Sequence, residues 1–234
     1  MTIAAKSRIS APVLLRPLIA EALGTGLLVA TVVGSGVMAQ NLAPGQVLLQ
    51  LLCNALATVA VLGLLIALFA SVSGAHFNPA VTLAAAVTGA CRWPTAAGYL
   101  VAQFVGGCLG TVLAHAMFGQ TLVQWTGQTR GGAGQLLGEV VATAGLLLVI
   151  TLLVRDRRAH LVPVAVPAWI FAGYFFTSST SFANPAVTVG RALTGSFAGI
   201  APASVPAFVL AQLAGAAVGV GVAHLVRGWS TESQ

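Results

Sequence analysis

Long apolar runs separated by short polar segments make up most of the chain. Six of them hold about 20 residues or more, the length at which an α-helix crosses the hydrocarbon layer of a membrane. These runs are 17–39, 47–71, 95–118, 135–154, 161–181 and 204–226. The pattern therefore predicts six membrane-spanning helices.

Two shorter apolar segments, 78–88 and 184–194, follow the second and fifth runs. As helices they would each be about 16 Å long, roughly half the thickness of the hydrocarbon layer. Both begin with Asn-Pro. Asn is a favoured N-cap, and Pro suits the first helical position because its missing N–H would have no partner there. The sequence predicts two half-membrane helices.

The chain also repeats itself. NPAVTLAAAVTG (78–89) and NPAVTVGRALTG (184–195) agree at eight of twelve positions, and VAQFVGGCLGTVLAH (101–115) resembles LAQLAGAAVGVGVAH (210–224). We therefore expect two homologous halves, 1–128 and 129–234, that together form one domain. Each half holds three spans and one half-helix, and an odd number of spans requires the halves to be inverted relative to one another. The predicted fold class is an all-α membrane protein with an inverted 3+3 repeat.

Composition supports a membrane protein. Apolar residues make up 58% of the 234 residues and charged residues only 6%, with a mean hydropathy of +0.97. A soluble domain holds about 25% charged residues. The chain shows no nucleophile-and-base spacing, no cofactor motif and no metal-ligand spacing among its three cysteines. We therefore expect neither an enzyme nor a bound cofactor or metal.

The basic residues indicate an orientation. Eight of the ten fall at four places that alternation of the spans puts on one side: Lys6, Arg8, Arg16, Arg92, Arg155, Arg157, Arg158 and Arg227. An excess of Lys and Arg marks the cytoplasmic side. The net charge of +6 is thus an orientation signal rather than a nucleic-acid patch. We expect a multi-pass protein of the cell (inner) membrane with both termini in the cytoplasm.

The repeated Asn-Pro-Ala phrase predicts a pore. Inversion points the N-termini of both half-helices at the membrane centre, where each contributes roughly half a positive charge. Asn78 and Asn184 can offer amide N–H groups to a solute there. A cation or proton meets an unfavourable potential at this point, whereas a neutral hydrogen-bonding molecule does not. We expect a channel for small neutral solutes.

At these residues the chain resembles the aquaporins, the major intrinsic protein family. The resemblance rests on SGAHFNPAVT, FANPAVT, an early Glu in each half (Glu21 and Glu139), Gln103 and the plan of spans. It implies a homotetramer in the lipid bilayer, with one pore in each protomer.

The family resemblance also locates an outer selectivity ring. Most members have an arginine at the third position after the second Asn, and Val187 stands there in this chain. By the same counting the other ring positions are Thr58, Ala172 and Ser181, with Phe171 and Gly173 as neighbouring alternatives to Ala172. Such a ring is expected to be wider and less polar than that of water-selective members.

Arg191 qualifies this expectation. It lies four residues after Val187, on the same helical face one turn later, and the matching residue of the first half is Ala85. An ionisable group at membrane depth usually faces a cavity or a partner. Two interpretations stay open: Arg191 replaces the missing arginine in the filter, or it caps outer-loop carbonyls or pairs across a protomer interface.

A narrower resemblance links the chain to bacterial aquaglyceroporins associated with arsenic-resistance operons. It rests on NPAV in the second motif, Thr58 in the ring and the TSSTSF loop. It implies passage of water, glycerol and arsenite or methylated arsenicals. The alternatives are a water-selective aquaporin that uses Arg191, and an inverted-repeat secondary transporter, which would need ion-coordinating groups at the midplane.

Several buried polar residues are expected to support this architecture. Glu21 and Glu139 are predicted to accept hydrogen bonds from the broken backbone beside each half-helix, with a proton relay as the alternative. Gln103 and Gln212 are expected to brace the same connections. His76, near the cytoplasmic mouth, is either a hydrogen-bonded structural residue or a pH gate. The pairs Gly106/Gly110 and Gly215/Gly219 predict close helix contacts.

Overall fold

The computed structural model describes residues 11–227, and within this range the chain contains helices and loops but no strand. The elements are α1 (Ala11–Leu42), α2 (Val47–Ser73), α3 (Pro79–Val87), α4 (Trp93–Met117), α5 (Ala133–Arg155), η1 (Ala159–Leu161), α6 (Val162–Phe176), α7 (Pro185–Arg191), η2 (Pro202–Ser204) and α8 (Val205–Arg227). Two residues of the orientation argument, Lys6 and Arg8, lie outside the described range.

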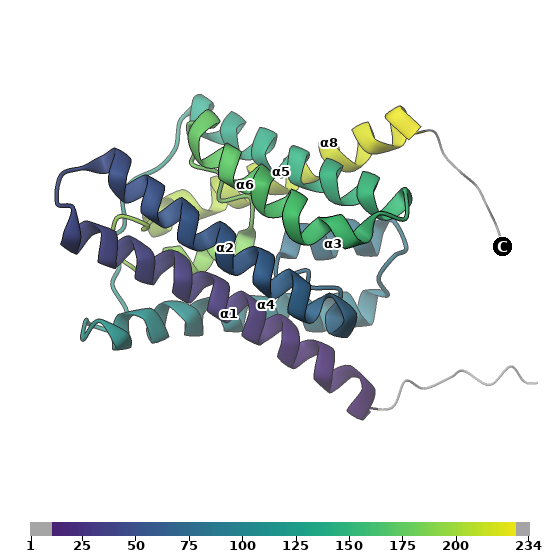
Figure 1. Ribbon diagram of the computed structural model, residues 1–234, viewed down its shortest axis with the longest axis horizontal. Helices are drawn as coiled ribbons and strands as arrows, with labels where there is room; N and C mark the ends of the chain where they lie inside the picture. Colours follow the sequence, from purple (N-terminus) through teal and green to yellow (C-terminus); the bar gives the residue numbers. More distant parts are fainter. Residues whose placement is uncertain (1–10, 228–234) are drawn as a thin grey trace, which may run out of the picture.

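The helices form one bundle of two halves. Helix α1 packs on α2 and α4, whereas α5 packs on α6 and α8, and α2 meets α6 where the halves join. Figure 1 shows the first group in the lower part of the view and the second in the upper part. Six helical segments of the described chain are long and apolar enough to cross a membrane. The predicted all-α fold with six spans and two half-helices is confirmed.

Two helices are shorter than the hydropathy pattern predicts. Helix α6 ends at Phe176 rather than near 181, and the following segment turns into left-handed backbone at Thr180 (φ 62°) and Ser181 (φ 53°). Hydroxyl side chains compete with helical hydrogen bonds, and here the Thr177 hydroxyl donates to the Gly173 carbonyl at 2.7 Å. Helix α7 ends at Arg191 rather than near 194 because the chain closes there in tight turns.

Small residues allow the closest helix contacts in both halves. A Cβ added to Gly106 or to Gly110 of α4 would lie 2.2 Å from a backbone oxygen of α1. The same addition at Gly215 and Gly219 of α8 would come within 2.5 and 2.2 Å of backbone oxygens of α5. Both pairs therefore pack as the sequence predicts, since only glycine lets the backbones approach this far.

Replacing Gly110 by alanine should destabilise the bundle. The new methyl group would have to push α4 away from α1, and overpacking of this kind costs about 1–3 kcal/mol. The apparent unfolding temperature of the purified protein in detergent should fall for Gly110→Ala. It should stay unchanged for Gly131→Ala, because a Cβ at that loop position meets nothing within 4 Å. Equal unfolding temperatures for the two variants would contradict the packing argument.

Candidate functional site

A cavity of about 710 Å³ lies between the two halves of the bundle. Its lining includes Arg155 and His224, at the ends of α5 and α8, and Arg191, at the end of α7. Between them the wall is mainly apolar, from side chains such as Leu62 and Val166. An apolar passage with a few polar groups suits a small solute that needs only a few hydrogen bonds.

The two half-helices begin beside this cavity, each capped by its Asn. The Asn78 side-chain oxygen accepts the Ala80 N–H at 2.9 Å, and the Asn184 oxygen accepts the Ala186 N–H at 2.9 Å. Both Asn residues precede a proline at the first helical position. The local sequence therefore specifies where both helices start.

Each Asn also reaches across to the other half. The Asn78 amide donates to the Ala183 carbonyl at 2.7 Å, and the Asn184 amide donates to the Phe77 carbonyl at 2.8 Å. An amide NH₂ group carries two N–H donors, so one on each Asn remains for a passing solute. Both Asn residues line the cavity.

The backbone leading into each half-helix is held in an unusual conformation. Ala75 and Phe77 have φ values of 50° and 46°, and Ser181 and Ala183 have values of 53° and 49°. Left-handed residues that alternate with other conformations turn successive N–H groups to one side, forming an anion-binding concavity. In both halves that concavity is filled by a carboxylate of the protein itself.

In the first half the carboxylate is Glu21. It is fully buried and accepts the peptide N–H groups of His76 (2.9 Å) and Phe77 (2.7 Å). The Gln103 amide donates both to Glu21 and to the Thr82 hydroxyl, each at 2.8 Å. Helices α1, α3 and α4 are thereby tied to one strained loop.

The second half repeats this network. Glu139 is fully buried and accepts the peptide N–H groups of Phe182 and Ala183, both at 2.9 Å. The Gln212 amide donates to Glu139 at 2.6 Å and to the Thr188 hydroxyl at 2.8 Å. These are the contacts expected of structural support, and the cavity lining consists of other residues.

His76 lines the cavity and is held on two sides. Its Nδ1 lies 3.1 Å from the Thr82 hydroxyl, and its ring packs edge-on against Tyr99 with centroids 5.4 Å apart. These contacts agree with the interpretation of His76 as a hydrogen-bonded structural residue.

Three of the four predicted ring residues meet at the cavity, and the fourth does not. Thr58, Ser181 and Val187 line it, whereas Ala172 is exposed on the outside of α6. Tyr174 takes the place expected for Ala172, and its hydroxyl donates to the Thr58 hydroxyl at 3.3 Å. Two residues along a helix turn the side chain by about 200°. The residue type could have identified Tyr174 from the sequence, because a tyrosine combines an apolar ring with a polar hydroxyl group.

Arg191 is buried and lines the same cavity. Its Nε–H donates to the Ala198 carbonyl of segment 192–204, which follows α7, and its guanidinium carbon lies 3.4 Å from the centroid of the Phe182 ring. Arg191 thus caps a carbonyl of that segment and also lines the cavity, whereas its part in a filter stays a prediction. The Ser181 hydroxyl nearby is buried without a hydrogen-bond partner in the part of the chain that is described.

A profile described as "Major intrinsic protein" matches residues 8–182 of the chain. The chain belongs to the major intrinsic protein family. Aquaglyceroporin AqpS of Rhizobium meliloti (strain 1021) is 47% identical over 203 residues, covering 87% of this chain and 86% of that protein. Aquaporin NIP1-4 of Oryza sativa subsp. japonica is 36% identical over 162 residues, covering 67% of this chain and 58% of that protein.

The fold has a solved counterpart within the major intrinsic proteins. The aquaglyceroporin from Plasmodium falciparum superposes with a TM-score of 0.63 at 22% identity, covering 90% of this chain and 93% of that one. The family and the fold together confirm the prediction of a multi-pass membrane channel for small neutral solutes.

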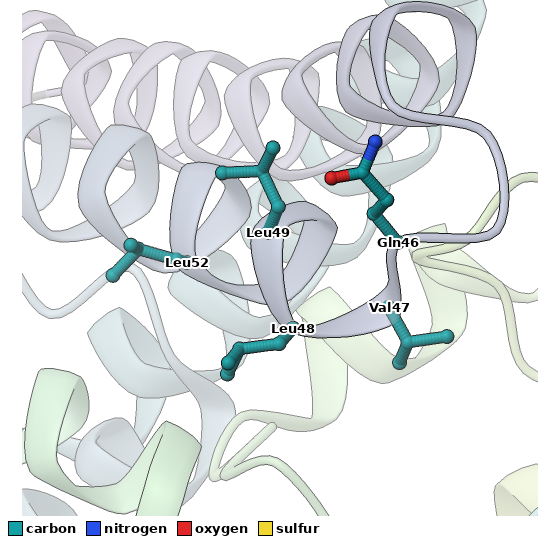
Figure 2. A pocket seen from close by; sticks show the side chains of 5 residues that line it. All are labelled: Gln46, Val47, Leu48, Leu49 and Leu52. Atoms are coloured by element: carbon teal, nitrogen blue, oxygen red, sulfur yellow. The ribbon is translucent and has the colours of Figure 1, made fainter.

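A second hollow lies apart from the channel. Figure 2 shows it at the start of α2, where Gln46 is the only polar residue among its five lining side chains; the others are Val47, Leu48, Leu49 and Leu52. It shares no residue with the central cavity. Its exposed apolar side chains suit contact with lipid or with another membrane helix.

Replacing either buried Glu by Gln should loosen one half of the channel and spare the other. Gln offers a single acceptor oxygen without charge, and hydrogen bonds to a charged group contribute about 1.5–3 kcal/mol each. Glu139→Gln should speed amide hydrogen exchange at 181–184 by on the order of tenfold or more. Glu21→Gln is the matched control and should act on 75–78 instead. Exchange that rises equally in both segments would contradict the assignment of one carboxylate to each half.

Proposed function

We propose that the protein is a passive channel for water, glycerol and arsenite, with an outer filter formed by Thr58, Tyr174, Ser181 and Val187. The observation that carries this proposal is Val187 at the cavity wall, at the place where most family members have an arginine. The relative that is 47% identical over 203 residues is named an aquaglyceroporin, which is in keeping with the proposal.

The chemistry of this outer end suits polyhydroxyl solutes. Thr58, Tyr174 and Ser181 bring hydroxyl groups to the cavity, and Val187 supplies an apolar wall beside them. Glycerol has hydroxyls along one edge and C–H groups along the other, so it can use both surfaces at once. Arsenite is neutral As(OH)₃ at physiological pH and presents three hydroxyls on a molecule of similar size. The partnerless Ser181 hydroxyl is a ready hydrogen-bond partner for either solute.

Charge selection follows from the same geometry. Two helix N-termini meet at Asn78 and Asn184 and contribute positive potential there. Arg191 adds a full positive charge further out along the cavity. Cations and protons are therefore disfavoured, and neutral molecules pass. Secondary transport has little support, because both midplane carboxylates are occupied by backbone N–H groups.

A water-selective channel is the second candidate, and one observation favours it. The Arg191 side chain lines the cavity and could narrow it one turn from the usual arginine position. The two candidates differ in whether glycerol passes the native protein.

The wider arrangement is also part of the proposal. Halves 1–128 and 129–234 build one pore in each protomer of a homotetramer in the cell membrane, with both termini in the cytoplasm. The cluster Arg155, Arg157 and Arg158 at the end of α5 and just after it supports this orientation. Exposed Leu residues on α2, such as Leu48, Leu56 and Leu68, provide apolar surface for lipid or for neighbouring protomers.

Introducing the usual arginine should restrict the channel to water. Val187→Arg should lower glycerol and arsenite permeability of proteoliposomes by on the order of tenfold or more, about 1.4 kcal/mol or above. Water permeability should remain within a few-fold of the native value. Val187→Leu, which changes shape without charge, is the matched control and should keep glycerol flux. If native protein passes water alone and Arg191→Met admits glycerol, the water-selective candidate is correct.

Uptake should not depend on an ion gradient. Glycerol entry into proteoliposomes should proceed at the same initial rate with and without an imposed proton or sodium gradient, because in the described part of the chain both buried carboxylates, Glu21 and Glu139, are engaged by backbone N–H groups. The measured quantity is the initial rate of glycerol entry, followed by light scattering, with protein-free vesicles as the baseline. Accumulation of glycerol above its external concentration would rule out a passive channel.

A further inference from the structure

Two arginine side chains meet on neighbouring carbonyls of the outer segment 192–204. The Arg191 Nε–H donates to the Ala198 carbonyl, and the Arg130 Nε–H donates to the Gly199 carbonyl at 3.1 Å. Arg191 belongs to α7, whereas Arg130 comes from the loop that joins the two halves of the chain. One turn of backbone therefore brings together two positive charges from distant parts of the sequence.

Phe182 lies against both of them. Its ring centroid is 3.4 Å from the guanidinium carbon of Arg191 and 5.0 Å from that of Arg130. These distances are within the range of a cation–π interaction, and the first places the Arg191 guanidinium directly on the ring. The ring itself cannot move far, because Phe182 is 4% exposed and packs edge-on against Phe208 at 5.3 Å. Its N–H is held by Glu139.

The first half of the chain lacks this pair. His76 occupies the place of Phe182, two residues before the Asn, and Ala85 occupies the place of Arg191. The surrounding network is otherwise alike in the two halves, down to an aromatic ring packed edge-on against each residue. Two departures from the repeat thus fall on residues that touch, which indicates that they act together.

The geometry points to Phe182 as a positioning residue for Arg191 in the outer filter, assisted by Arg130. This inference rests on the proposed function, and it adds the Arg191 cation to the four residues of the proposed outer filter. The bond to Ala198 fixes only the Nε end of the guanidinium, and the plane can still rotate. Stacking on Phe182 fixes that plane. Arg130 carries the same charge and binds the adjacent carbonyl. Its repulsion therefore disfavours a movement of the Arg191 side chain toward the outer loop.

Burial lowers the pKa of Arg130 from its ordinary value, and Glu139 opposes that shift. A guanidinium remains protonated across physiological pH, so Arg130 keeps the charge that this arrangement needs. Arg130 is also anchored by its own backbone, whose N–H donates to the Ser204 hydroxyl at 3.0 Å. The loop between the halves therefore contributes to the outer end of the pore.

The test compares the ratio of glycerol to water permeability in proteoliposomes among single and double variants. Arg191→Met should raise this ratio several-fold by removing the cation. Phe182→Leu should reproduce at least half of that rise, although Arg191 is still present, whereas Phe182→Tyr should retain the native ratio because it keeps the aromatic ring. Phe182→Leu combined with Arg191→Met should equal Arg191→Met alone. Arg130→Met should raise the ratio by a smaller factor.

The outcomes separate the inference from the proposal beneath it. If Arg191→Met leaves the ratio unchanged, the filter role of Arg191 fails, and the inference fails with it. If Arg191→Met raises the ratio but Phe182→Leu does not, only the positioning role is overturned. Should Phe182→Leu fail to fold, Phe182→His replaces it, since it installs the residue of the first half. Phe182→Met, which has a flexible apolar side chain without a ring, is measured beside it; its ratio should rise as for leucine, and a native ratio for Phe182→Met would overturn the inference.

Discussion

Backbone that leaves helical geometry at membrane depth must find its hydrogen-bond partners inside the protein. Here two buried carboxylates, Glu21 and Glu139, supply those partners to the loops before the half-helices. Burial of a charged carboxylate costs free energy, and the N–H groups that converge on each Glu offset that cost. Each Glu is held in turn by a Gln from the helix that closes its half.

The arrangement of the channel follows from this support. With their N–H groups turned toward the Glu side, the loops 74–77 and 180–183 present their other face to the cavity. In the proposed channel both half-helices then begin at the membrane centre, and their positive ends and the Asn amides are offered to the solute there. The outer end adds hydroxyl groups, an apolar Val187 and the cation of Arg191. Selection is thus built on geometry that the buried network maintains.

Much of this could be predicted from the chain itself, because the decisive signals are local. Hydropathy marks the spans, and Asn-Pro marks the start of each half-helix to the residue. The ring position on α6 was different, since it required counting back across a loop with left-handed residues at Thr180 and Ser181. The count arrived at Ala172, on the outer face of the helix, instead of Tyr174. The stacking of Arg191 on Phe182 could not be predicted either, because it depends on irregular backbone, and hydrophobic periodicity predicts only regular elements.

The reciprocal bonds of the two Asn residues have a consequence for how the channel is assembled. Every partner of Glu21 lies in the first half, so that network can close as soon as α4 has been made. The Asn78 amide, however, needs a carbonyl that lies 105 residues further along the chain. Neither half can provide the carbonyl that its own Asn amide needs. The centre of the proposed pore can therefore form only when synthesis has delivered residues 183 and 184 of the second half.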